Sequence, residues 1–334
     1  METTYDKRYE VITKYMKRLD GENLLTGRFI HYTSIDSAFA ILDSDSFWAA
    51  NVRFSNDAME ERILKLDGME DRDDYIVCFC MKEDILSQWR GYCHNGGAAI
   101  QLKLNYTREY SILHADFDSS GNFVLYDNTP LPVIYLNPDD CSGQVKGFLE
   151  SDINSCGYDN DILLEDMLPY FKNGHFKEEC EARMVFSNTE GILSKCIRFR
   201  TLSDGVKVPY IVVKYGNMGK MKGACNTDIS QYDDQRIETL AKNREPIWID
   251  EGYDQESKYY EMLKRVEDFR ENTGWRRNVS ILCKGKLPVV KITVAPTYDR
   301  ERKAEQIRRF CQSKYWLKNV QVEVSDIPYI QPLL

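Results

Sequence analysis

The 334-residue sequence predicts an α+β fold in which an antiparallel or mixed central sheet is flanked by helices. Strand-like and helical segments do not alternate regularly, which argues against a doubly wound parallel sheet. Apolar and polar residues alternate clearly in 98–104 and 319–324, as in strands with one buried face. The phosphate-binding motifs GxGxxG and GxxxxGK[S/T] are absent from the sequence, so Rossmann and P-loop folds have no support.

The individual elements follow from local patterns. Strands are expected where β-branched, aromatic and other apolar residues gather between turn-forming residues, at 28–32, 47–50, 75–80, 98–104, 131–136, 182–186, 208–214, 288–294 and 319–324. Helices are expected where the apolar spacing is three to four, at 58–66, 161–172, 231–243, 254–271 and 300–312. A further helix should begin after Ser34, a good N-cap, because Ile35, Phe39 and Leu42 follow at helical spacing.

The length predicts one large domain with an insertion. Residues 28–215 and 285–334 are expected to form a single α+β core domain. The charged stretch 216–284 is the best candidate for a helical insertion. Residues 1–27 should form a helix packed on this core, because apolar and aromatic residues recur there at helical spacing, at Tyr5, Tyr9, Ile12, Met16 and Leu19.

Composition restricts the partners. The sequence has 53 acidic and 44 basic residues, and its net charge of −9 disfavours general attraction to nucleic acid or anionic membranes, although a local basic groove is permitted. No apolar segment approaches the roughly 20 residues that span a bilayer. We expect a cytoplasmic protein with reduced thiols at its ten cysteines, since the N-terminus lacks an apolar signal region. The four scattered histidines predict no metal site.

The first cluster of candidate functional residues follows the start of the core. His31 and Thr33 lie two apart on an expected strand and should share one face, with Tyr32 on the other. A polar loop follows the second strand and contains Asn56. The alternative for this loop is structural, because Asp57 can cap a helix that begins at the next residue.

The second cluster is Ser87-Gln88-Trp89-Arg90-Gly91-Tyr92. A guanidinium beside two aromatic rings suits a ligand ring stacked on Trp89 or Tyr92, with a phosphate on Arg90. The alternative is that the rings anchor a helix and that the guanidinium makes a structural ion pair.

The third cluster precedes and enters the strand expected at 182–186. Glu179, Glu181 and Arg183 should share one face of this strand, and Ala182 should lie on the apolar face. Three charges would then line a cleft. The alternative is a solvated sheet face, which is the more common place for alternating charges.

Five blocks together resemble the signature of a bacterial family called domain of unknown function 2971. They are HYTS, NVRFSNDAME, SQWRGY, FKEECEARMVF and VEVSDIPYI, and the resemblance runs from about residue 28 to 332. The segment 216–284 does not align to this pattern. The N-terminal block also resembles, more distantly, DarT-type toxins and other members of the ADP-ribosyltransferase superfamily.

The resemblance implies an ADP-ribosyltransferase-like core that uses NAD as substrate, as in a bacterial toxin or an antiviral-defence effector. His31 and Thr33 match the residues that hold NAD, and Glu179 or Glu181 would be the catalytic carboxylate. The remaining candidates for the NAD site are polar, aromatic or cationic residues of the same blocks: Tyr32, Asn56, Ser87, Trp89, Arg90, Tyr92 and Arg183. No metal is expected to take part.

Two other functional classes stay open. The same residues could form a sensor module that binds a nucleotide or a partner protein without turnover. A metal-independent nuclease with His31 and Glu181 as acid and base is also open, although no motif supports it. The acceptor of ADP-ribose, whether protein, nucleic acid or water, and the oligomeric state are not specified by the sequence.

Overall fold

The structure is a computed structural model of the whole chain. It describes residues 10–12, 14, 28–54, 73–93, 96–104, 112–116, 123–124, 130–137, 139–148, 151, 167–188, 191, 193–194, 196–202, 205–217, 224–225, 235, 247–252, 281–284 and 286–328. Every structural statement below concerns these residues.

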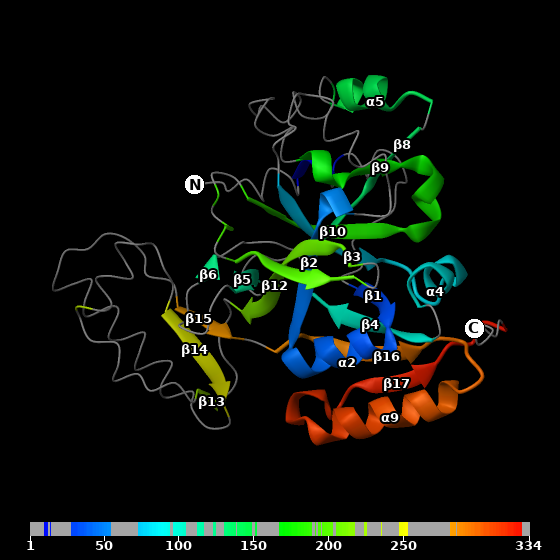
Figure 1. Cartoon of the computed structure of the whole chain (residues 1–334), viewed down its shortest axis with the longest axis vertical. Coiled ribbons are helices and arrows are strands. Elements are labelled where there is room, and N and C mark those ends of the chain that lie inside the picture. The colour runs from blue at the N-terminus through cyan, green and yellow to red at the C-terminus, as the bar shows by residue number, and fades with distance from the viewer. Residues whose placement is uncertain are drawn as a thin grey trace.

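A large mixed sheet forms the centre of the molecule (Figure 1). In order across it, the strands are β13 (Ala224–Cys225), β14 (Ile247–Gly252), β15 (Ile281–Lys284), β12 (Lys207–Asn217), β2 (Ser46–Asn51), β3 (Asp74–Cys80), β1 (Arg28–Ser34), β4 (Gly97–Lys103), β16 (Val289–Val294) and β17 (Gln321–Val324). The pairs β14–β15 and β16–β17 are parallel, and the other pairs along this order are antiparallel.

Further strands pair outside this order. They are β10 (Glu181–Ser187) on β3, β7 (Leu131–Pro132) on β10, β11 (Arg198–Thr201) and β5 (Ile112–Asp116) on β12, and β6 (Phe123–Val124) on β5. The strands β8 (Ile134–Leu136) and β9 (Phe171–Asn173) form a separate parallel pair. The α-helices are α2 (Ile35–Ser44), α4 (Leu86–Tyr92), α5 (Cys141–Phe148) and α9 (Arg300–Ser313). Short 3₁₀ turns are η1 (Val52–Phe54), η4 (Leu168–Tyr170), η5 (Gly174–Glu179) and η8 (Tyr315–Leu317).

The predicted α+β fold with a mixed central sheet is therefore confirmed. Helices α2 and α9 pack on one face of the sheet and contribute buried residues such as Leu42 and Ile307 to the larger apolar core. Ser34 caps α2 as expected, because its hydroxyl accepts a hydrogen bond from the Ser37 backbone N–H at 3.2 Å. None of the described helices combines the length and the apolar character needed to cross a bilayer.

Two predicted elements differ from the structure. The strand expected at 131–136 is broken after Pro132, because β7 pairs with β10 while β8 pairs with β9 in the other sheet. The end of the helix expected at 161–172 is instead a single 3₁₀ turn around Pro169 followed by β9. Proline favours the first turn of a helix, and the aromatic residues after it favour a strand.

The segment 216–284 is not wholly helical as expected. Apart from Gln235, which is helical, its described parts are strands, and β15 joins the sheet by pairing with Gly216 and Asn217 at the end of β12. The helices expected at 58–66 and 254–271 lie outside the described residues, and so does the one at 231–243 apart from Gln235.

The N-terminal segment meets the second core. Val11 and Ile12 are helical and buried in an apolar cluster on the other face of the sheet, with residues such as Ile76 and Val185. The expectation that 1–27 forms a helix packed on the core stays a prediction, because residues 1–9, 13 and 15–27 lie outside the described residues.

The sheet opens along one edge of β3. On its other edge, β10 pairs with β3 over the whole strand, from Glu181↔Cys80 to Ser187↔Asp74. On the open edge, β2 pairs only with Tyr75 and Ile76, and β1 pairs only with Cys80. Residues 77–79 have no described strand partner on this edge, so β1 and β2 diverge and leave a gap between them. Helix α2 connects the end of β1 to the start of β2.

Candidate functional site

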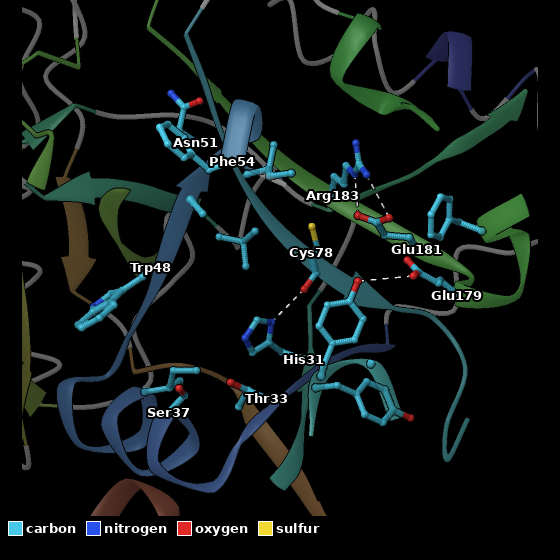
Figure 2. A pocket seen from close by; sticks show the side chains of 18 of the residues that line it. His31, Thr33, Ser37, Trp48, Asn51, Phe54, Cys78, Glu179, Glu181 and Arg183 are labelled. Atoms are coloured by element: carbon cyan, nitrogen blue, oxygen red, sulfur yellow. Dashed lines mark hydrogen bonds and ion pairs between the residues drawn. The ribbon is translucent and has the colours of Figure 1, made fainter. Parts of the chain in front are cut away.

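A pocket of about 630 Å³ lies in this gap. Both faces of the sheet contribute to its wall, which includes α2 on one side and β10 on the other (Figure 2). Strands β1, β2, β3, β9 and β11, helix α4 and the turns η1 and η5 also line the pocket. A cavity of this volume falls in the range of sites that bind small molecules and cofactors.

His31 occupies the position where β1 leaves β3. Its Nδ1 donates a hydrogen bond to the Cys78 carbonyl oxygen at 2.9 Å, which replaces the backbone pairing that the diverging strands lose. Edge-on contacts with Phe47 and Phe79 fix the ring plane. Burial lowers the pKa of His31, an effect that the hydrogen bond to Cys78 only partly offsets. The ring is therefore neutral with its proton on Nδ1, and Nε2 is a hydrogen-bond acceptor.

Hydroxyl groups line the pocket beside this imidazole. Thr33 lies two residues along β1, and Ser37 comes from the first turn of α2 (Figure 2). Ser87, at the start of α4, also lines the pocket, and its buried hydroxyl has no hydrogen-bond partner among the described residues. Because an unpaired buried hydroxyl costs free energy, a polar ligand group that reaches Ser87 would be favoured.

Four charged side chains form a compact ion network on the opposite wall. The Glu181 carboxylate accepts from Arg183 Nε at 2.6 Å and from Arg183 Nη2 at 3.1 Å. Lys172 Nζ donates to Glu181 Oε2 at 2.6 Å and to Glu179 Oε2 at 2.8 Å. Arg183 Nη1 also donates to the Pro169 carbonyl at 2.7 Å. The expected alternative of a solvated sheet face is wrong for Glu181 and Arg183, which are both buried.

The two carboxylates have different electrostatic environments. Burial alone would raise the pKa of Glu181, but Arg183 and Lys172 outweigh it and lower this pKa to about 2. Burial raises the pKa of Glu179, and Lys172 offsets this only in part. Burial alone would lower the pKa of Lys172, but Glu181 and Glu179 raise it, so the ammonium stays charged. Glu181 therefore stays ionised and is held by its cationic partners. Glu179, whose raised pKa lets it take up a proton more readily, is the adjustable carboxylate of the pair.

Tyr92 connects α4 to Glu179. Its hydroxyl lies 3.5 Å from Glu179 Oε1 and donates to it, and the residue is partly exposed. Desolvation raises the pKa of Tyr92, and the negative charge of Glu179 adds to the rise, so the hydroxyl keeps its proton. The neutral Tyr92 hydroxyl therefore donates to Glu179, the carboxylate whose charge the ion network compensates less than that of Glu181.

The structure brings most of the predicted site residues to one pocket. Those that line it are His31, Tyr32, Thr33, Ser87, Tyr92, Glu179, Glu181 and Arg183. The sequence blocks predict that His31, Thr33, Ser87, Arg90 and at least one of Glu179 and Glu181 converge on one cleft, and the pocket is lined by all of these except Arg90. The side chain of Tyr32 is engaged by the protein rather than offered to a ligand. Its ring packs edge-on against Trp89, and its hydroxyl accepts a hydrogen bond from the Ile85 N–H.

Three predicted site residues are not brought there. Trp89 is fully buried, and its Nε1 donates to Asp84 Oδ1 at 2.7 Å, so the alternative of a helix anchor is correct and a ligand ring cannot stack on it. Arg90 is exposed on α4 and does not line the pocket, which rules out the phosphate contact expected for it there. Asn56 lies outside the described residues.

Several lining residues were not predicted. Lys172 was expected at the end of a helix, and nothing in the local sequence indicated that its ammonium group would pair with two glutamates. Cys78 was not proposed as a site residue, but it lines the pocket and its thiol interacts with Glu181. Trp48 lies in the strand expected at 47–50 but was not proposed as a site residue, and Arg200 lies in β11, where no strand was expected.

No group of three or more histidine, cysteine, aspartate and glutamate side chains that could hold a metal ion occurs in the described part of the chain. Comparison of the chain with protein-family models, with curated proteins and with solved structures gave no match. The resemblance to the two families named above therefore stays a prediction.

Proposed function

We propose that this pocket binds NAD and that the protein cleaves the nicotinamide–ribose bond, either transferring ADP-ribose to an acceptor or hydrolysing NAD. The observation that carries the proposal is that a neutral histidine and a hydroxyl on β1 meet an adjustable carboxylate in one pocket of a split sheet. His31 Nε2 would accept a hydrogen bond from a ribose hydroxyl, and Thr33 would add a second polar contact.

The chemistry requires stabilisation of positive charge on the ribose. When the bond from ribose C1′ to the nicotinamide nitrogen breaks, the electron pair leaves with the nicotinamide and C1′ acquires oxocarbenium character. A carboxylate beside the ribose lowers the energy of that state. The acceptor oxygen then bonds to C1′, and its proton passes to the carboxylate, which acts as general base.

The electrostatics favour Glu179 over Glu181 for this role. Glu181 is bound by both Arg183 and Lys172, so its charge is already compensated. Among the described residues, Glu179 makes an ion pair with Lys172 alone, and it is less buried than Glu181. Its raised pKa makes it the stronger base of the two carboxylates. Glu181 would then position Lys172 and, through it, the reacting carboxylate.

A second candidate function is a sensor that binds a nucleotide without turnover. The observation that favours it is the ion network itself, because Lys172 is held by both glutamates and partly neutralises Glu179 as well. Both functions use the same pocket, and they differ only in whether bound NAD is consumed.

Nicotinamide release distinguishes the two. Wild type incubated with NAD and cell extract, which supplies an acceptor, should release nicotinamide, and Glu179→Gln should reduce the rate about 10²- to 10³-fold because the charge is lost while the shape is kept. The matched control is Glu178→Gln, an exposed neighbour that also lines the pocket but has no contact with Lys172, and it should keep most of the rate. Binding of NAD without release by wild type would favour the sensor, and equal rates in wild type and Glu179→Gln would remove Glu179 from the mechanism.

A further inference from the structure

The pocket has a second end, on the far side of His31 from the carboxylates. Figure 2 shows Trp48 and Glu179 on opposite sides of His31. Trp48 belongs to β2, and Arg200 of β11 also lines the pocket. The ion network and the proposed chemistry use neither residue, so this end is free for another part of a ligand.

The strand register places these two residues on one face of the sheet. Trp48 lies opposite Val212 on β12, and Arg200 lies opposite Val208, four residues earlier on that strand. Because directly opposed residues share a face and the side-chain period is two, the indole and the guanidinium project to the same side. Tyr210 lies between these positions on the same face.

Arg200 is a cation with no counter-charge among the described residues. Of the three described cations that line the pocket, Lys172 is bound to two glutamates and Arg183 to Glu181 and a carbonyl. Arg200 is exposed and makes no ion pair with any described residue. A guanidinium in this state is suited to bind a phosphate group, because its planar donors match two phosphate oxygens.

Trp48 is an exposed ring that is already held in place. Its indole stacks on Tyr210 with a centroid distance of 4.7 Å and an interplanar angle of 29°, and yet 47% of Trp48 is accessible to solvent. A fixed and half-exposed indole at a pocket wall is suited to stack against a planar ligand group.

We propose that this end of the pocket binds the phosphate-bearing part of a nucleotide, with the phosphates on Arg200 and the base stacked on Trp48. The inference rests on the proposed nucleotide ligand but not on its cleavage. Arg200 takes the phosphate-binding role that was expected for Arg90, because Arg90 does not line the pocket and Arg183, which does, is bound to Glu181. The ribose to be attacked would then lie between His31 and Glu179.

Equilibrium binding of ADP and of adenosine tests this assignment. Isothermal titration should show that Arg200→Ala weakens ADP about tenfold or more, since a charge-assisted contact is lost, and leaves adenosine unchanged. Trp48→Ala should weaken both ligands by a similar factor. The control is Arg198→Ala, an exposed arginine on the same strand and the same face that does not line the pocket, and it should bind both ligands like wild type.

The outcomes separate this inference from the proposed function. If Arg200→Ala binds ADP like wild type, or if Arg198→Ala weakens ADP as much, the assignment of Arg200 is wrong even when wild type releases nicotinamide. If ADP binding depends on Arg200 but wild type releases no nicotinamide, the assignment stands and the cleavage proposal fails. Absence of ADP and adenosine binding by folded wild type would overturn the assignment.

Discussion

His31 connects folding to function at the scale of one residue. The same ring that completes the hydrogen bonding of Cys78 where the strands part also presents Nε2 to the pocket. The neutral tautomer is required for both roles, because the carbonyl can only accept and the ligand hydroxyl is expected to donate. Burial maintains that tautomer by lowering the pKa of His31.

The depressed pKa of His31 has a measurable effect on stability. Below its ordinary pKa of 6.5 the unfolded chain binds a proton that the folded protein excludes, so the free energy of unfolding should fall as the pH falls through this range. His31→Gln removes the titrating group and can still donate to Cys78. Denaturant unfolding of both proteins between pH 7 and pH 5 should give a flatter pH dependence for the variant, by at most about 1.4 kcal/mol per pH unit. Identical slopes would contradict a buried neutral imidazole.

Glutamate spacing illustrates what single residues can and cannot reveal. Alternation correctly predicted that Glu181 and Arg183 share a face opposite Ala182, because a strand fixes that period. It did not predict their burial, since Lys172 arrives from β9, a strand that forms only through non-local pairing with β8. The neutralising partner of a buried charge is set by tertiary structure, which a local pattern does not encode.

Helix α4 is positioned by the loop before it and by the end of the chain. Asp84 Oδ1 accepts from Trp89 Nε1 at 2.7 Å and from Ser325 Oγ at 2.6 Å. Asp84 Oδ2 accepts from the Asp326 N–H at 3.2 Å. The C-terminal block VSD, singled out in the sequence, thus acts through Asp84 to hold the helix that carries Ser87 and Tyr92.

Replacing Asp84 by asparagine tests this positioning role. Asp84 has a φ of 52°, which asparagine tolerates, so Asp84→Asn removes the charge without straining the backbone. The free energy of unfolding should fall by about 1–3 kcal/mol, because hydrogen bonds to a charged group are lost. Chemical denaturation measures this change, and Glu83→Gln, which removes only surface ion pairs with Arg28 and Lys291, should cost less than about 1 kcal/mol. Equal losses in the two variants would show that Asp84 has no special role.

At the scale of elements, local patterns were sufficient wherever one face of an element is buried. The strands at β1, β2, β3, β4, β10, β12, β16 and β17 and the helices α2 and α9 were all expected at nearly these positions. Elements that were not expected include β5, β6, β11, α5 and the strands β13, β14 and β15 within 216–284, and β7, β8 and β9 differ from the elements expected there. A run of apolar residues such as 131–136 does not show that its two halves join different sheets.

The whole molecule adds the feature that makes the site. Strand pairing leaves residues 77–79 without a neighbour on one edge, and the pocket occupies the space between β1 and β2. The sequence predicted that distant blocks would meet, but it could not predict a gap in the sheet, because the divergence of strands depends on all the pairings around β3. Figure 1 shows β1, β2 and β3 near the centre of the molecule, with α2 on the side toward α9.

A crystal structure of the Glu179→Gln variant with NAD tests the proposed site most directly, because the slowed chemistry should leave the substrate intact. We expect a ribose hydroxyl within hydrogen-bond distance of His31 Nε2, the nicotinamide-bearing C1′ beside residue 179, and the diphosphate toward Arg200. NAD bound elsewhere on the molecule, with the gap between β1 and β2 filled only by solvent, would contradict this expectation.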